Sequence, residues 1–162
     1  YVATGREISR AADYLGDVVQ KRIEIPYPAL REIVAKAGLA PDMDRAAARR
    51  HLARFKEEVL SAVYQLIAQE ARARDVVPLW IFLPQVREGD WQDETPATVR
   101  LAENAGYVVI DLSDIYTGAD PATMRLAEWD EHPNARAHQL IAARIYSALE
   151  EKRDLVFRAA AR

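Results

Sequence analysis

Two short, uninterrupted apolar runs separated by a helical segment constrain the fold of this 162-residue chain more than any other feature. They occupy residues 76–83 (VVPLWIFL) and 107–112 (YVVIDL). Neither run alternates polar and apolar residues, which is typical of strands buried on both faces of a parallel sheet. Between them, Thr95-Pro96 is typical of a helix start and predicts a helix over residues 95–104. A strand, a helix and a strand in this order predict a right-handed parallel crossover.

The segment that precedes the first run has steps of three and four residues between its apolar positions, as amphipathic helices do. We expect helices over residues 5–20, 28–37 and about 41–74. Gly38 stands where a glycine commonly closes a helix, and Asp42 is the expected N-cap of the third helix. Each helix has one apolar face, so each is expected to pack on a larger core.

The polar segments between these elements are expected to be loops. Trp91 lies in the first, over residues 85–94, where it either lines a cleft or covers the edge of the sheet. The second loop covers residues 113–132, with a helical turn at about 122–128, and the last helix is expected to begin at Pro133. Two buried strands do not form an independently stable sheet. Further strands are therefore expected from a missing N-terminal segment or from another chain.

Composition excludes several classes of function. The 22 Lys and Arg against 25 Asp and Glu give a net charge of −3, which argues against a nucleic-acid partner bound through its phosphates. No apolar run reaches the roughly 20 residues that a membrane span needs. The chain contains no cysteine, which excludes disulfides, thiolate zinc sites and a cysteine nucleophile.

One short segment combines a carboxylate with a histidine. Asp130 lies two residues before His132, in a loop that follows a predicted parallel strand, and such loops build the sites of α/β proteins. An aspartate there can accept the imidazole N–H and stabilise the imidazolium, so that the histidine acts as a general base. Two other interpretations stay open: His132 caps the following helix, or Asp130, Glu131 and His132 bind a hard metal ion. His51 is expected on an exposed helix face, and His138, six residues after His132, does not share a helix face with it, which excludes a metal pair of the i, i+4 kind.

Three segments in the second half of the chain carry a resemblance to a known family. They are VVPLWIFLPQV at residues 76–86, AENAGYVVIDL at 102–112 and DEHPNARAHQLIAARIYSAL at 130–149. In this order they resemble the C-terminal part of SGNH (GDSL-type) hydrolases. The resemblance implies a three-layer α/β/α, flavodoxin-like fold with a parallel sheet. It also implies that residues 1–40 are a helical insertion and that residues 41–162 are the C-terminal half of the hydrolase domain.

The resemblance implies a serine esterase that needs no metal or organic cofactor, with His132 as the general base and Asp130 as the residue that orients it. Two positions depart from the family pattern. Trp129 stands three residues before the histidine, where the family commonly has its aspartate, and Ala137 stands where glycine is usual. No serine lies in a Gly-Asp-Ser motif, and neither asparagine lies in a Gly-x-Asn-Asp motif. The nucleophile and the oxyanion donors are therefore expected on an N-terminal segment, in the same protein or as a separate chain.

The implied substrate is a carboxylic ester with an acetyl or short acyl group, on an acylated carbohydrate or a lipid. An alternative interpretation, motivated by the missing nucleophile, is a non-catalytic α/β module of the same fold that binds carbohydrate or protein. A Gly-Asp-Ser string upstream of this sequence distinguishes the two, since only the enzyme needs it. The chain by itself is expected to show no esterase activity.

Overall fold

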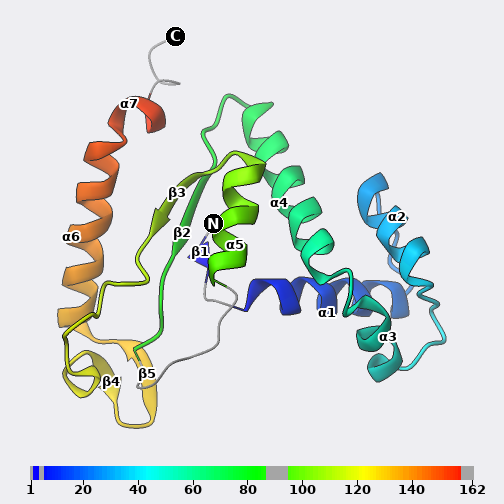
Figure 1. Cartoon of the computed structure of the whole chain (residues 1–162), viewed down its shortest axis with the longest axis horizontal. Helices are drawn as coiled ribbons and strands as arrows, with labels where there is room; N and C mark the ends of the chain where they lie inside the picture. The colour runs from blue at the N-terminus through cyan, green and yellow to red at the C-terminus, as the bar shows by residue number, and fades with distance from the viewer. Residues whose placement is uncertain (1, 4–5, 87–94, 158–162) are drawn as a thin grey trace.

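The computed structural model describes residues 2–3, 6–86 and 95–157 of the chain. Within these ranges the protein is mixed α/β, with seven α-helices, a three-stranded parallel sheet and a two-stranded antiparallel hairpin (Figure 1). Trp91 and its expected loop fall largely outside the described residues. Among the helices that are described, none is both long and apolar enough to cross a membrane.

The parallel sheet has the order β1-β2-β3. Its central strand β2 (Leu79–Phe82) pairs with β3 (Val108–Asp111) as expected, and with β1 (Val2–Ala3) on its other side. The expectation that this sequence contributes only two strands is therefore wrong. A strand of two residues is too short for hydrophobic periodicity to reveal it, and β1 is identified only by its pairing with β2.

The strand β2 is shorter than its apolar run because the start of that run closes the preceding helix. Asp75 has a left-handed backbone conformation (φ 56°), and the Val76 N–H donates to the Ala71 carbonyl of α4 (Lys56–Arg72). These residues satisfy carbonyl groups at the helix end and are not free to join the sheet.

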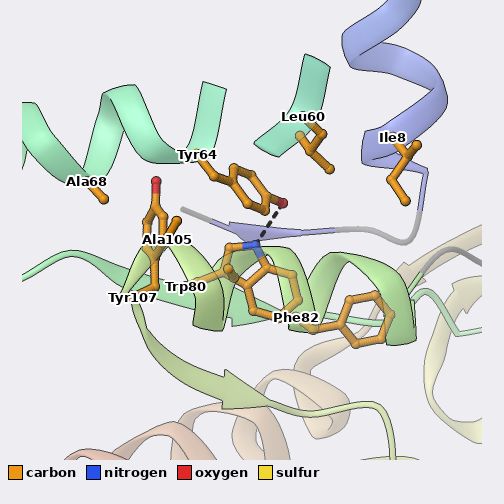
Figure 2. Packing of buried hydrophobic residues seen from close by; sticks show 9 residues of the cluster. Ile8, Leu60, Tyr64, Ala68, Trp80, Phe82, Ala105 and Tyr107 are labelled. Carbon is orange, nitrogen blue, oxygen red and sulfur yellow. Dashed lines mark hydrogen bonds between the residues drawn. The ribbon is translucent and has the colours of Figure 1, made fainter. Parts of the chain in front are cut away.

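One face of the sheet packs against α4 and α5 (Thr95–Ala105). Trp80 and Phe82 of β2 point to this face and are fully buried, and the Trp80 Nε1–H donates to the Tyr64 hydroxyl of α4 at 2.9 Å (Figure 2). Gly106 ends α5 in a left-handed conformation (φ 82°), as its place after the helix predicts. The Arg72 guanidinium donates to the carbonyls of Ala105 and Gly106, which joins the ends of the two helices.

The opposite face packs against α6 (Ala135–Glu151), which a short helix, α7 (Arg153–Val156), follows. Ile141 of α6 contacts Ile110 and Leu112 at the end of β3, and Leu79 and Ile81 of β2 pack beside them. Helices thus lie on both sides of the sheet (Figure 1). Successive side chains of β2 pack against helices on opposite faces, which explains the continuous apolar run of this strand.

The first two expected helices are present as α1 (Glu7–Gln20) and α2 (Pro28–Ala37). Gly38 closes α2 in a left-handed conformation (φ 62°). Leu15 of α1 and Ile33 of α2 are buried in a second apolar cluster that they share with α4.

The single helix expected over residues 41–74 is wrong, because the chain turns between two helices, α3 (Arg45–Leu52) and α4. The N-cap is Asp44 rather than Asp42, and its side chain accepts the Ala47 N–H at 2.8 Å. The turn lets α3 and α4 both pack on α1, while Leu52 and the first turns of α4 keep one continuous apolar stripe. Periodicity alone could not reveal a bend that leaves the stripe intact.

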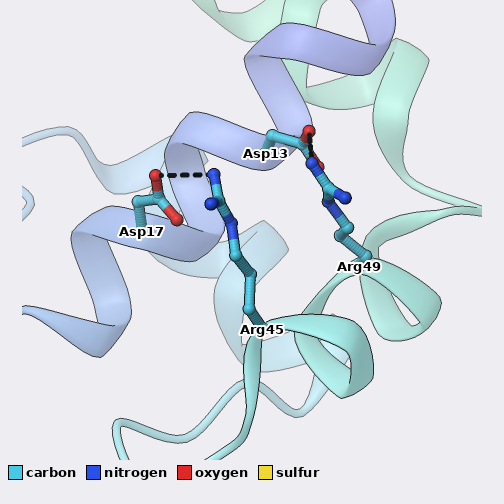
Figure 3. Close-up of polar contacts among 4 residues, drawn as sticks. All are labelled: Asp13, Asp17, Arg45 and Arg49. Atoms are coloured by element: carbon cyan, nitrogen blue, oxygen red, sulfur yellow. Dashed lines mark hydrogen bonds and ion pairs between the residues drawn. The ribbon is translucent and has the colours of Figure 1, made fainter.

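Two ion pairs join α1 and α3 on the side that faces solvent (Figure 3). The Arg49 guanidinium donates to both carboxylate oxygens of Asp13 at 2.8 and 2.6 Å, and Arg45 donates to Asp17 at 3.3 Å. Exposed pairs of this kind stabilise a protein by about 0–1 kcal/mol each, so they orient α3 more than they stabilise it.

The loop expected over residues 113–132, with its helical turn, is also corrected. The described chain forms a 3-10 turn, η1 (Pro121–Thr123), and a hairpin of β4 (Arg125–Ala127) and β5 (Asp130–Pro133). Pro133 ends β5 instead of beginning the helix, and Asn134 is the N-cap of α6. The hairpin is rich in charged residues and lacks the apolar alternation that predicts a strand.

Candidate functional site

Asp130 and His132 form a hydrogen-bonded pair on β5. The Nδ1 atom of His132 lies 2.5 Å from Oδ1 of Asp130, and the same oxygen accepts the backbone N–H of His132 at 3.0 Å. With Nδ1 as the donor, the proton-accepting nitrogen of a neutral imidazole is Nε2. Among the described interactions none involves Nε2, and the His132 side chain is 77% exposed against 23% for Asp130.

A β-bulge on β5 displaces His132 from regular pairing. Arg125 pairs with Pro133 and Ala127 with Asp130, so one residue of β4, Leu126, opposes two residues of β5. Such bulges bend a strand and redirect side chains, and they occur next to active sites. Here the bulge consists of Glu131 and His132, and it directly follows Asp130, whose carboxylate is hydrogen-bonded to His132.

The hairpin is held by hydrogen bonds to two other parts of the chain. The Asn134 side-chain amide donates to the carbonyls of Thr123 and Arg125 at 2.9 and 3.2 Å, and its backbone N–H donates to the Met124 carbonyl at 2.8 Å. The Val86 N–H donates to the Glu131 carbonyl at 3.1 Å. The position of the Asp130–His132 pair is therefore set by buried neighbours rather than by the exposed hairpin alone.

These bonds place the pair at the carboxyl end of the parallel sheet. Val86 follows shortly after the last residue of β2, and it packs in a small buried cluster with Met124 and Ala137. The hairpin lies beyond the ends of β2 and β3 (Figure 1). This edge is where open α/β sheets commonly bind ligands.

The two hydrogen bonds from His132 lower the pKa of Asp130. The backbone N–H is the larger cause and the ring N–H is the second, because both stabilise the ionised carboxylate. Asp130 is therefore an anion at neutral pH, as an orienting partner of an imidazole has to be. The pair can remove a proton from a hydroxyl group that approaches Nε2.

The other two histidines take no part in the described bonds of this pair. His51 of α3 is exposed, and its Nδ1 atom is 2.8 Å from the Ala37 carbonyl at the end of α2. His138 is exposed on the first turns of α6, and its backbone N–H bonds to the Asn134 carbonyl. In the described part of the chain, no group of three His, Cys, Asp or Glu side chains is placed to hold a metal ion.

The chain's four serines lie on α1 and α4, after β3 and on α6, and no described interaction joins one to His132. Asp111 accepts the Ser113 N–H, and Asp114 pairs with Arg144 of α6, so both carboxylates have structural roles.

The sequence did not reveal Leu126 or Val86 as neighbours of the site. Their relation to His132 depends on the hairpin and on contacts distant in sequence, for which no local signal exists.

The sequence also did not predict a cavity of about 560 Å³. It lies between α1, α2 and α4, its lining is mostly apolar, and neither Asp130 nor His132 contributes to it.

In comparisons with known proteins, no family model, no curated protein and no solved structure matches this chain.

Proposed function

We propose that this chain is the C-terminal part of an SGNH-like serine esterase, in which His132 is the general base and Asp130 orients it. One observation carries the proposal: the Asp130 carboxylate holds Nδ1 of His132 at 2.5 Å and leaves Nε2 exposed at the carboxyl end of a parallel sheet. That arrangement has the form of the base and orienting residue of a catalytic triad.

The nucleophile in this proposal is a serine on a segment outside this sequence. Nε2 of His132 removes the serine proton as Oγ attacks the ester carbonyl carbon, and Asp130 stabilises the imidazolium. Donors on the same outside segment stabilise the oxyanion. The imidazolium then gives its proton to the leaving alcohol as the ester C–O bond breaks. A water molecule, deprotonated by His132, attacks the acyl group on the serine, and the imidazolium returns this proton to Oγ as the carboxylic acid leaves.

The proposal includes the finer fold that the resemblance implies, a three-layer, flavodoxin-like α/β/α domain. Helices on both faces of β2 and the parallel order β1-β2-β3 support it. In the proposal residues 41–162 belong to the hydrolase domain and residues 1–40 are a helical insertion, except that β1 (Val2–Ala3) joins the sheet of that domain. The substrate is an acetyl or short-acyl ester of a carbohydrate or lipid.

The test measures hydrolysis of p-nitrophenyl acetate by this chain alone and by the full protein that includes a Gly-Asp-Ser segment. For the chain alone we expect no hydrolysis beyond that of free imidazole at an equal concentration of histidine side chains, and for the full protein we expect catalytic turnover. His132→Ala in the full protein is expected to lower kcat by about 10³-fold or more, because the general base is lost. Asp130→Asn is expected to lower kcat by about 10²–10⁴-fold.

A matched control is needed because any exposed imidazole hydrolyses this ester slowly. His138→Ala removes the other exposed histidine of this region and is expected to leave kcat unchanged. Full turnover by the His132→Ala protein would contradict the proposal.

A second candidate is a non-catalytic module of the same fold that binds carbohydrate or protein. It is motivated by the sequence, in which no serine lies in a Gly-Asp-Ser motif. This candidate predicts a degenerate Gly-Asp-Ser segment and no turnover by the full protein.

A further inference from the structure

Trp129 is the most exposed large hydrophobic side chain of the described residues, at 86%. It occupies the two-residue turn that joins β4 to β5, beside Glu128. Turns of this kind favour glycine, asparagine and aspartate, and an exposed indole adds nothing to a core. Neither the turn nor the packing therefore explains a tryptophan at this position.

The hairpin that carries the Asp130–His132 pair also carries two strongly exposed apolar side chains, Trp129 and Leu126. Trp129 immediately precedes Asp130, and Leu126, which is 62% exposed, opposes Glu131 and His132 across the bulge. Cross-strand neighbours have Cβ atoms about 5 Å apart. Leu126 is thus a cross-strand neighbour of His132, and Trp129 lies in the turn directly before Asp130.

The surface around Trp129 is also preorganised. The base of the hairpin is fixed by the bonds of Asn134 to Thr123 and Arg125 and by the bond of Val86 to Glu131. An indole has only two side-chain torsions, so it is ordered on binding at a low cost in entropy. A rigid aromatic side chain on a fixed hairpin is suited to orienting a ligand.

The polar groups around the indole indicate which ligand it fits. Glu128 and Glu131 are exposed on either side of the Trp129-Asp130 step, and their carboxylates accept hydrogen bonds from hydroxyl groups. The C–H groups on one face of a pyranose ring carry partial positive charge and suit the negative face of an indole. A long aliphatic chain gains nothing from carboxylates and needs a groove rather than a flat exposed surface.

We infer that Trp129 contacts the substrate and that the alcohol part of the ester is a pyranose ring, stacked on the indole and hydrogen-bonded to the neighbouring carboxylates. The inference rests on the proposed function, since it places the scissile ester at His132. It narrows the proposed substrate from an ester of a carbohydrate or a lipid to an acylated sugar.

The experiment titrates the ¹⁵N-labelled chain with methyl β-D-glucopyranoside and follows the Trp129 indole N–H and the His132 ring protons by NMR. We expect saturable shifts of both signals. Trp129→Leu is expected to raise the Kd, read at His132, about tenfold, which corresponds to about 1.4 kcal/mol. Trp129→Phe is expected to retain part of the affinity, because it retains an aromatic face.

Tyr14→Leu is the matched control, because it removes another strongly exposed aromatic side chain, on α1, and is expected to leave the Kd unchanged. Tetramethylammonium and butyrate test the other ligand classes for an exposed indole, a cation and an acyl chain. Saturation by either of these probes without saturation by the glucoside overturns the inference, as does a Kd that Trp129→Leu leaves unchanged.

The outcomes separate this inference from the proposed function. Sugar binding is measured without turnover, so it can succeed in a protein in which His132→Ala leaves hydrolysis unchanged, and in that case only the esterase proposal fails. If the full protein needs His132 for hydrolysis but Trp129→Leu leaves KM for an acetylated glucoside unchanged, only the inference on Trp129 fails.

Discussion

The Asp130 carboxylate accepts two hydrogen bonds at one oxygen, and both come from His132. The backbone bond depends on the path of β5 and the ring bond depends on the imidazole. Since the backbone bond is the largest single cause of the lowered pKa of Asp130, part of the shift does not require the imidazole. The chain conformation itself therefore prepares an anion for His132.

A titration of Asp130 by NMR tests how much the backbone bond and the ring bond each lower its pKa. We expect a pKa below the roughly 3.9 of an unfolded aspartate, and in His132→Ala a pKa that rises but stays below that value. Because folding lowers the pKa of Asp130, its two hydrogen bonds stabilise the hairpin above about pH 4. This stabilisation is lost as the pH falls through the pKa of Asp130 in the folded protein. An ordinary pKa in His132→Ala would show that the ring bond alone causes the shift.

The buried hydrogen bond between Trp80 and Tyr64 leads to a second prediction about a single residue. Tyr64→Phe leaves the Trp80 N–H without this acceptor in the core, and we expect a loss of about 1–3 kcal/mol in the free energy of unfolding. Urea denaturation measures it. Tyr14→Phe removes an exposed hydroxyl and is expected to change the stability by less than about 0.5 kcal/mol. Equal losses in the two variants would contradict the role of this bond.

Among the elements, the helix ends and turns carry the clearest local signals. Gly38 and Gly106 both adopt the left-handed conformation expected after a helix, because a side chain is strained there. Gly16 differs, since it lies within α1, where a Cβ atom would meet Leu52 and Ala48 at ordinary contact distances of 3.5 and 3.7 Å.

Two glycine-to-alanine variants should therefore have opposite effects. Gly16→Ala is expected to raise the free energy of unfolding by up to about 1 kcal/mol, because alanine favours a helix. Gly106→Ala is expected to lower it by more than about 1 kcal/mol, because the added Cβ strains the backbone and collides with the Arg72 guanidinium. Urea denaturation of both variants checks this. A loss of stability in Gly16→Ala would show that α1 and α3 are packed too closely for the methyl group.

For the molecule as a whole, the sheet is held between α4 and α5 on one face and α6 on the other. The helix α6 also begins at Asn134, which anchors the hairpin that contains Asp130 and His132. Packing of α6 on the sheet therefore links global stability to the geometry of the site.

Ile141→Ala tests how much the packing of α6 on the sheet contributes to the stability of the protein. It removes a buried side chain from the contact between α6 and β3, and we expect a loss of about 2–5 kcal/mol in the free energy of unfolding. Leu140→Ala changes the neighbouring, exposed residue of the same helix and is expected to cost less than about 1 kcal/mol. Similar losses in the two variants, measured in urea, would mean that α6 contributes little to the core.

The sequence by itself determined the features that depend on nearby residues. The bounds of α2 follow from Pro28 and Gly38, and the two main strands follow from their apolar runs. The hydrogen bond between Asp130 and His132 joins residues two positions apart, so the motif could be recognised before the fold was known.

Only the tertiary structure decided the features that depend on distant contacts. The strand β1 exists through its pairing with β2, and α3 separates from α4 because both pack on α1. The hairpin depends on hydrogen bonds from Val86 and Asn134 to residues 9 to 45 positions away. The orientation of the His132 side chain depends on the hairpin. Such contacts leave no periodic trace in the sequence, because each is made by a single backbone or amide group that only the folded chain brings into reach.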